Sequence, residues 1–340
     1  MMNVRKKFDT ALSDTVEEWK KKDKVRGIFV YGSYAKGTVT ANSDLDICVV
    51  WDKEEAPAKL PADHKGIRID MTFLYPRAIE DALSNKAKDC LGVAEVVCRL
   101  KGARVLHDTG GMLRKLQQRA LEYKWSEDII KGLKAHAVES LANAVRLSEQ
   151  EEDWMSATYE LRNGLFDLGR VLLMKNNIFC IIKPSEVLNE VRMLDPMTYG
   201  LFLRTFKLKG LEEEDLRGIL GDVRHWAGIA EERLKKAQGD TAAGLLAQAQ
   251  REYYGAGGLT IGGDYELAVF EMRQSVQTLG LALLAIDGLI DLDRGMVVKE
   301  LQEHESEFYD QVFIEYGSID FQPKEIKRSI GEAQFVAQRL

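Results

Sequence analysis

The first 110 residues switch between a helical and a strand-like spacing of apolar positions. Residues 3–22 place Phe8 and Leu12 one helical turn apart, which predicts an amphipathic opening helix. Short runs rich in β-branched and aromatic residues predict strands at 27–31, 44–51, 66–75 and 103–108. A helical pattern covers 77–100, and the segment 52–65, which contains two prolines, is typical of a loop.

From residue 112 onward nearly every segment has a helical pattern, and one stretch is repeated. Residues 153–177 align without gaps with residues 264–288, at a shift of 111 positions. The identical pairs include Asp153/Asp264, Ala157/Ala268, Glu160/Glu271, Arg162/Arg273, Leu168/Leu279, Gly169/Gly280 and Leu173/Leu284. Amphipathic helices can resemble one another by chance, but a mid-helix glycine costs about 1 kcal/mol, so its recurrence favours a true repeat. We expect Gly169 and Gly280 to make equivalent close contacts between helices.

These patterns predict an α+β fold in three parts. The parts are a small mixed-sheet domain at 1–110, a helical bundle at 111–238 and a second, repeated bundle at 239–340. The charge changes along the chain, because residues 1–108 hold 19 Lys and Arg against 17 Asp and Glu, whereas residues 109–340 hold 28 against 37. A near-neutral part followed by an acidic part indicates units that handle different ligands.

The overall composition narrows the class of protein. The 340 residues are 45% hydrophobic and 30% charged with a net charge of −7, which is ordinary for a soluble globular chain. The longest strongly apolar stretch, 279–286, is too short to cross a bilayer, and the N-terminal residues lack the apolar core of a secretory signal. Four cysteines without metal-ligand spacing fit reduced thiols in a cytoplasmic protein: Cys48, Cys90, Cys98 and Cys180. We therefore expect no membrane partner, and the acidic balance argues against nucleic acid.

The segment that carries candidate chemistry joins the first two predicted strands. The first strand ends at Tyr31, and Gly32 and Ser33 open a turn into a helix, where glycine lets the backbone approach a phosphate and the helix start favours negative charge. Ten residues separate Ser33 from Asp44, and Asp46 follows two positions later, so both carboxylates point to one face of a strand. Two such carboxylates repel each other unless a cation lies between them, and hard oxygen ligands suit Mg²⁺. A phosphate cradle opposite a carboxylate pair suits phosphoryl or nucleotidyl transfer.

A third carboxylate, Asp70, lies at the centre of GIRIDMTFL. We expect its strand to pair with 44–51 and so to bring Asp70 near Asp46. Each signal alone is weak, because a Gly-Ser turn is usually only a turn and a strand aspartate is commonly solvated. Their combination in this order favours an active site.

The stretch GSYAKGTVTANSDLDICVV resembles the signature of the DNA polymerase β-type nucleotidyltransferase superfamily, and IRIDMTF matches that superfamily's third carboxylate. The resemblance covers residues 27–108 and implies a small mixed sheet flanked by helices, two divalent metal ions (Mg²⁺ or Mn²⁺) and an NTP, for which we expect ATP. It implies that Asp44 and Asp46 hold both metals and that Asp70 completes the catalytic one. The phosphate contacts that it implies are Gly32 and Ser33, with Lys36 and Ser43 as additions. The alternative for Lys36 is a solvated helix lysine.

The helical part has a resemblance of its own. RNGLFDLGRVLLMKNNIFCIIKPSEVLNEV resembles the helical domain of kanamycin nucleotidyltransferase and related HEPN bundles. In that family a glutamate on the first helix of this domain is the general base, and the matching residue here is Glu139, on a helix predicted at 127–149. His136 is the alternative base, and Asn143 stands where the family has a lysine that contacts the nucleotide. Neither bundle has the Arg-to-His spacing of the ribonuclease form, so ribonuclease activity is not expected.

We therefore predict a metal-dependent nucleotidyltransferase that moves NMP from an NTP to a hydroxyl of a small acceptor. An acidic helical part favours a cationic acceptor such as an aminoglycoside. The alternative is a module that nucleotidylates a protein, or one partner of a toxin–antitoxin-type pair, and the doubled bundle keeps this alternative open. A polymerase ranks third, because no basic groove is evident. A second copy of the chain is a further candidate partner.

Overall fold

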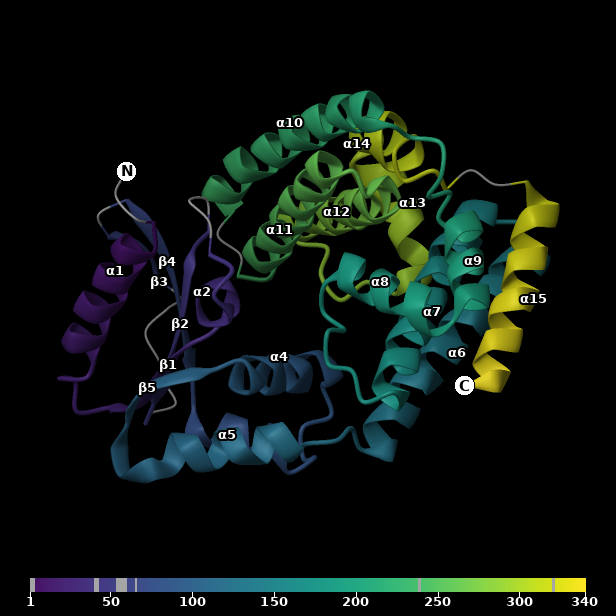
Figure 1. Ribbon diagram of the computed structural model, residues 1–340. Helices are drawn as coiled ribbons and strands as arrows, with labels where there is room; N and C mark the ends of the chain where they lie inside the picture. Colours follow the sequence, from purple (N-terminus) through teal and green to yellow (C-terminus); the bar gives the residue numbers. More distant parts are fainter. Residues whose placement is uncertain (1–3, 40–42, 53–59, 65, 238–239, 320–321) are drawn as a thin grey trace. The chain divides into compact units, whose positions relative to one another are not determined.

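The computed structural model describes residues 4–39, 43–52, 60–64, 66–237, 240–319 and 322–340. The chain divides into two compact units, Met1–Ile129 and Ile130–Leu340. The first unit contains a sheet with helices and the second is helical, so the predicted α+β class is confirmed (Figure 1).

The sheet of the first unit has five strands in the order β3-β4-β2-β1-β5. The strands are β1 (Val25–Val30), β2 (Leu45–Trp51), β3 (Leu60–His64), β4 (Ile67–Leu74) and β5 (Arg104–Asp108). The pair β2–β4 is parallel and the other pairs are antiparallel, which makes the sheet mixed. Because β2 and β4 run in the same direction while β1 runs against β2, both parallel strands begin at the edge where β1 ends.

Side-chain alternation decides which helices cover each face of the sheet. Leu45, Ile47 and Val49 of β2 point into a core closed by α1 (Val4–Trp19), whose Phe8 and Leu12 are buried there. Three further helices pack on one another: α3 (Pro76–Leu83), α4 (Cys90–Lys101) and α5 (Met112–Glu122). Helix α5 contacts β1 and β5, and Arg99 and Glu95 of α4 lie near Cys48, on the opposite face of β2. A short helix, α2 (Gly32–Lys36), follows β1, and a single 3₁₀ turn (Thr109–Gly111) precedes α5.

Two of the predicted elements of this unit are wrong in part. The predicted loop 52–65 contains β3, which pairs as an edge strand with β4; an edge strand tolerates Pro61 because one side of its backbone needs no partner. Residues 53–59 and 65 of that segment lie outside the described residues. The predicted helix 77–100 is two helices, because Asn85 adopts a left-handed conformation (φ 57°) and Asp89 caps a new start by accepting from two backbone N–H groups.

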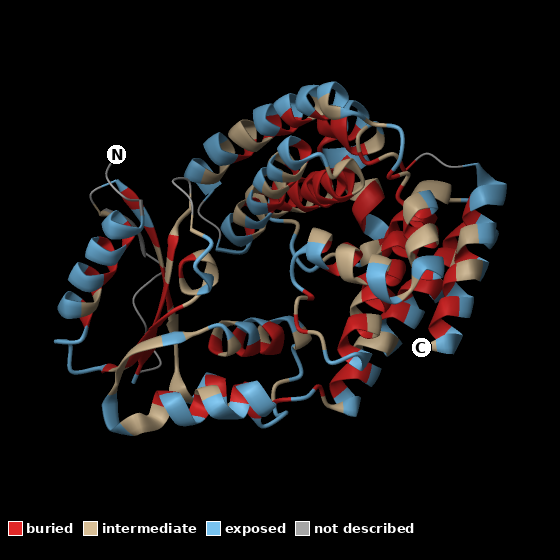
Figure 2. Ribbon diagram, viewed as in Figure 1, coloured by how far each residue is buried: buried red, intermediate tan, exposed pale blue. Residues whose placement is uncertain are grey.

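The second unit consists of helices. They are α6 (Glu127–Glu149, which begins in the first unit), α7 (Trp154–Lys175), α8 (Pro184–Leu194), α9 (Pro196–Thr205), α10 (Glu213–Ala237), α11 (Asp240–Gly262), α12 (Tyr265–Ile286), α13 (Val297–His304), α14 (Ser306–Phe308) and α15 (Pro323–Arg339), with a 3₁₀ turn at Arg294–Met296 and a π-helical turn, η3, at Tyr309–Ile314. The helix predicted at 127–149 is confirmed as α6. Helix α12 is buried along nearly its whole length (Figure 2).

Local features of the internal repeat recur in the structure. Left-handed residues recur at the shift of 111 found in the sequence: Glu152 and Gly263, Asn177 and Gly288, Lys207 and Ser318. Asp153 and Asp264 cap α7 and α12 in the same way, each accepting from the backbone N–H three residues later. We call residues 152–207 the first repeat and residues 263–318 the second.

The two mid-helix glycines lie at equivalent close contacts, as predicted. A Cβ on Gly169 would lie 3.0 Å from Phe202 and 3.4 Å from Val187, on α9 and α8. A Cβ on Gly280 would lie 3.2 Å from Leu301 and Phe308, on α13 and α14. In each repeat the glycine therefore lets the long helix approach the two short helices that follow it.

The helix that follows each repeat packs against the other repeat. Helix α10 comes after the first repeat and packs against α11 and α12, whereas α15 comes after the second repeat and packs against α7 and α9. The two repeats therefore share one interleaved core. Among the described residues, no helix combines the length and apolar character needed to cross a membrane.

Candidate active site

The start of α2 lies directly against β2 at the candidate site. Gly32 has φ +67°, and a Cβ placed there would lie 1.9 Å from Oδ2 of Asp46. The backbone N–H of Tyr31 donates to the carbonyl oxygen of Asp46 at 3.1 Å. Glycine is required at this turn for two reasons, its left-handed conformation and the absence of a side chain against the carboxylate.

The strand register places two of the predicted carboxylates side by side. Asp46 of β2 is paired directly with Asp70 of β4, and both are half-buried. Asp46 is the second residue of β2 and Asp70 is the fourth residue of β4, and β2 begins at the edge of the sheet where β1 ends. Asp44 lies one residue before β2, so the prediction that it lies within the strand is wrong by one position. The expected proximity of Asp70 to Asp46 is confirmed.

The residues predicted to contact phosphate surround the same turn. Gly32 and Ser33 begin α2 and are half-buried, and Ser43 is half-buried just before Asp44. Lys36, in the last turn of α2, is exposed. The first N–H groups of a helix have no partner within the helix, so this turn presents donors beside the Asp46 carboxylate.

An aromatic and cationic group near Asp46 was missed by the sequence reasoning. The hydroxyl of Tyr31 lies 3.4 Å from Oγ1 of Thr72, and the Arg99 guanidinium lies 5.2 Å from the centre of the Tyr31 ring. Burial raises the pKa of Tyr31 to about 12; the Asp46 charge adds to this shift and Arg99 opposes it. Tyr31 and Thr72 adjoin the motifs and could have been found by their positions, but Arg99 reaches the site from α4, 53 residues beyond Asp46.

The predicted general base and its alternative both lie on α6. Glu139 is exposed. Nδ1 of His136 lies 2.9 Å from Oδ2 of Asp167, and Oδ1 of Asp167 accepts from Arg170 at 3.0 Å. Asn143 donates to Glu160 at 3.4 Å, so it serves the helix packing. Glu139 and the aspartates of the sheet belong to different units, and its catalytic role stays a prediction.

The repeated Glu and Arg of the long helices are buried, which fits a structural role. The Arg162 side chain donates to the carbonyl oxygens of Thr205, Gly317 and Ser318 at 2.9, 2.5 and 2.7 Å. Its counterpart Arg273 is buried, and its Nε and Nη1 have no hydrogen-bond partner among the described residues. Burial lowers the pKa of Arg273 to about 9 and raises that of Glu160.

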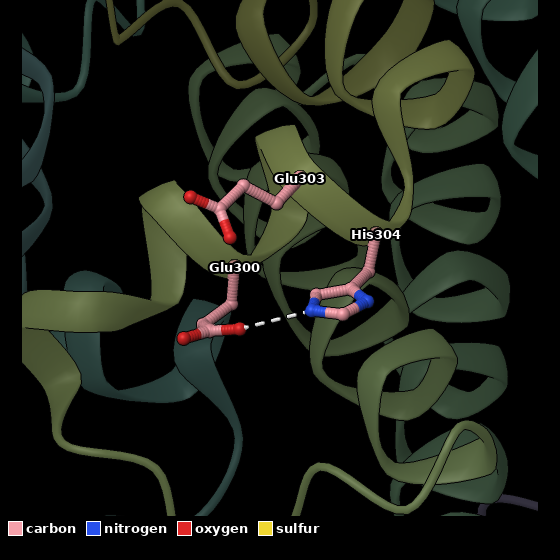
Figure 3. A group of neighbouring side chains, drawn as sticks. All are labelled: Glu300, Glu303 and His304. Atoms are coloured by element: carbon pink, nitrogen blue, oxygen red, sulfur yellow. Dashed lines mark ion pairs between the residues drawn. The ribbon is translucent and has the colours of Figure 1, made fainter.

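A group with metal-ligand residue types occurs on α13. Glu300, Glu303 and His304 place possible ligand atoms within 4.8 Å of one another (Figure 3). Oε2 of Glu300 lies 3.3 Å from Nε2 of His304, one helical turn away. An ion pair at this spacing is ordinary on a helix surface, so it accounts for the group without a metal.

Comparison with known proteins assigns the first unit. Residues 12–101 match the family model of the nucleotidyltransferase domain. A crystal structure of a nucleotidyltransferase-like protein from Exiguobacterium sibiricum 255-15 aligns with 91% of this chain and 88% of its own, at 12% sequence identity and a TM-score of 0.42, which is too distant to carry an assignment. None of the curated proteins compared with the chain matches it.

The matched range contains the Gly32 turn and all three aspartates of the candidate site. The first unit therefore contains a nucleotidyltransferase domain, and the protein is a transferase enzyme.

Proposed function

We propose that the chain transfers NMP from an NTP, with ATP as the first candidate, to a hydroxyl of a small cationic acceptor such as an aminoglycoside. The observation that carries the proposal is the contact between the Gly32 turn and the Asp46 carboxylate, with Asp70 in register beside it. Backbone donors for a phosphate and carboxylates for a cation thus meet at one edge of the sheet.

The residues at this edge fit a pair of divalent ions, Mg²⁺ or Mn²⁺. Asp44 and Asp46 would hold both ions and Asp70 would complete the catalytic one, because carboxylate oxygens are the ligands that such ions prefer. When bound, the ions lower the pKa of the attacking hydroxyl and neutralise the charge on the departing pyrophosphate.

The residues of the chain orient the triphosphate and take up the proton of the acceptor hydroxyl. The turn at Gly32 and Ser33, with Ser43 and Lys36, orients the triphosphate. The acceptor oxygen forms a bond to the α-phosphorus while the bond from that phosphorus to the bridging oxygen of pyrophosphate breaks. Glu139 is proposed as the base that takes the hydroxyl proton, since aspartates committed to cations are poor bases. The acidic second unit favours a cationic acceptor.

The test follows the label from an NTP labelled at the α-phosphate. The full chain is incubated with each of the four NTPs, Mg²⁺ and a panel of aminoglycosides, and small products are separated from protein. Label on an aminoglycoside supports the proposal. Label on the chain or on an added protein would favour protein nucleotidylation instead. If no label reached an aminoglycoside or a protein with any of the four NTPs, both functions would be contradicted.

A further inference from the structure

The Tyr31 side chain lies across the sheet beside the proposed metal site. Tyr31 follows Val30, which is paired with Ile47 of β2, so Tyr31 stands opposite Asp46. Its hydroxyl lies 3.4 Å from Oγ1 of Thr72, on β4. Because β2 lies between β1 and β4 in the sheet, the Tyr31 side chain must pass over β2 to make this contact.

The face of the sheet that Tyr31 crosses is the one that presents the two aspartates. Side chains two positions apart on a strand share a face, so Asp46 shares its face with Cys48, and Asp70 shares its face with Thr72. Cys48 and Thr72 are paired with each other, in the row of side chains next to the paired aspartates. The Tyr31 ring therefore lies over this second row, next to the carboxylates.

Helix α4 packs a cation against this ring. The Arg99 guanidinium lies 5.2 Å from the centre of the Tyr31 ring, and it also pairs with Glu95 one turn earlier on α4. The Arg99 side chain is only 12% exposed, so the contact with the ring is shielded from water. By contrast, 3.4 Å is long for a hydroxyl hydrogen bond, which is usually about 2.7–2.8 Å. The contact with Arg99 therefore fixes Tyr31 more firmly than its hydroxyl does.

Asp46 is confined between the Tyr31 ring and the residue that follows Tyr31. Oδ2 of Asp46 would lie 1.9 Å from a Cβ on Gly32, so this carboxylate points to the Gly32 turn. The backbone N–H of Tyr31 donates to the carbonyl oxygen of Asp46 at 3.1 Å, which keeps the two residues at one level of the sheet. Neighbouring carboxylates repel each other, so an unrestrained Asp46 would turn away from Asp70. A fixed ring beside Asp46 limits that movement.

We propose that Tyr31 and Arg99 are positioning residues, which hold the Asp46 carboxylate at the Gly32 turn beside Asp70 and so pre-organise the metal site. Arg99 acts by fixing the Tyr31 ring, and the ring acts by restraining Asp46. The inference rests on the proposed function, because it takes the aspartates as metal ligands. Groups that orient metal ligands from behind typically contribute roughly 10- to 100-fold to metal affinity.

The test measures Mn²⁺ binding by electron paramagnetic resonance on the full chain without nucleotide. Tyr31→Leu removes the ring and should weaken Mn²⁺ binding by roughly 10- to 100-fold. Tyr31→Phe keeps the ring against Arg99 and loses only a weak hydrogen bond, so its affinity should stay within about threefold of the parent. The control is Tyr254→Leu, at an exposed position of α11, which should leave the affinity unchanged. Thermal unfolding of each variant gives the folded fraction to which its affinity refers.

Arg99→Met separates a positioning role from an effect of charge. Removal of a cation near the site strengthens the binding of another cation, so a purely electrostatic role predicts tighter Mn²⁺ binding. A positioning role predicts binding that is about tenfold weaker. The control is Arg77→Met on α3, where the arginine side chain is 83% exposed. Because Arg99 acts through the ring, adding Arg99→Met to Tyr31→Leu should change the affinity by no more than about twofold.

Four results would overturn this inference alone. They are parent-like affinity in Tyr31→Leu, equal losses in Tyr31→Phe and Tyr31→Leu, unchanged or tighter binding in Arg99→Met, and additive losses in the double variant. Each is read beside Asp46→Asn, in which Mn²⁺ binding should be lost. Undiminished binding in Asp46→Asn, or no Mn²⁺ binding by the parent, would overturn the metal site of the proposed function as well.

Discussion

The two units place their charged side chains in opposite surroundings. In the first unit, Asp46 and Asp70 are half-buried side by side on two parallel strands, and Asp46 lies beside a backbone turn that requires glycine. In the second unit, Glu160, Glu252 and Glu271 are buried inside the helical core, and burial raises the pKa of each. The comparison teaches that the acidic composition of the second unit does not by itself mark a reactive site.

The same contrast separates effects on activity from effects on stability. Half-buried carboxylates side by side on neighbouring strands can take a cation, so their loss should affect turnover. Charged groups inside the helical core act through desolvation and hydrogen bonds, so their loss should affect the free energy of unfolding.

The largest expected effect is that of Asp46→Asn on turnover. Cation stabilisation of the transition state is worth several kcal/mol, and loss of a residue proposed to hold two ions should cost roughly 10⁴-fold in kcat. The free energy of unfolding without metal should stay equal or rise, because the repulsion between Asp46 and Asp70 is relieved. Labelled-NTP turnover, metal titration and urea unfolding measure the three quantities.

The control for this variant is Asp81→Asn, on α3 with a side chain 40% exposed. It should retain turnover and metal affinity. Undiminished metal affinity in Asp46→Asn would remove Asp46 from the proposed metal site.

The second effect concerns Glu139, the exposed carboxylate proposed as a base on the helical unit. Glu139→Gln should keep NTP binding while turnover falls by roughly 10²–10⁴-fold, the usual contribution of a general base. Unchanged turnover with a good acceptor would show that Glu139 is not the general base and would leave that role to His136, another acid or the metal alone.

The third effect compares the two repeats at one position. Arg162→Met removes the donors to three backbone carbonyls and should lower the free energy of unfolding by about 3–5 kcal/mol. Arg273→Met removes a buried guanidinium that has two nitrogens without partners, so it should be neutral or stabilising. Urea unfolding of both variants gives the difference, and equal destabilisation would contradict the contrast between the repeats.

The smallest effect is the pH dependence due to Glu252 of α11. Gln248 donates to it at 2.9 Å, yet burial, aided by the nearby Glu271, raises its pKa to about 7. Because the unfolded carboxyl has an ordinary pKa near 4.3, the folded state binds the extra proton between these values. The contribution of Glu252 to stability therefore falls as pH rises from about 4.5 to 7.

Glu252→Gln should remove this slope and leave the protein about 1–3 kcal/mol more stable than the parent at pH 8. Urea unfolding of both proteins between pH 5 and 8 measures the difference, with the exposed Glu303→Gln as the control. Parallel stability curves for Glu252→Gln and the parent would show that Glu252 titrates normally.

Much of the candidate site and the repeat could be predicted because their signals are local. The order of a strand, a glycine turn and a second strand with Asp44 just before it and Asp46 within it follows from local backbone conformation, which neighbouring residues alone specify. The match of 153–177 to 264–288 recurs as matching caps and left-handed residues, which depend on neighbouring residues, and as glycine contacts made within one repeat.

Contacts between distant segments were decided only by the tertiary structure. Pairing with β4 makes a strand of residues 60–64, and packing of α4 brings Arg99 onto Tyr31. The crossing of α10 and α15 between the repeats, and the different partners of Arg162 and Arg273, follow from how whole helices fill a shared core. A local pattern specifies a backbone conformation and a buried face, but what lies against that face depends on shape complementarity among elements far apart in the chain.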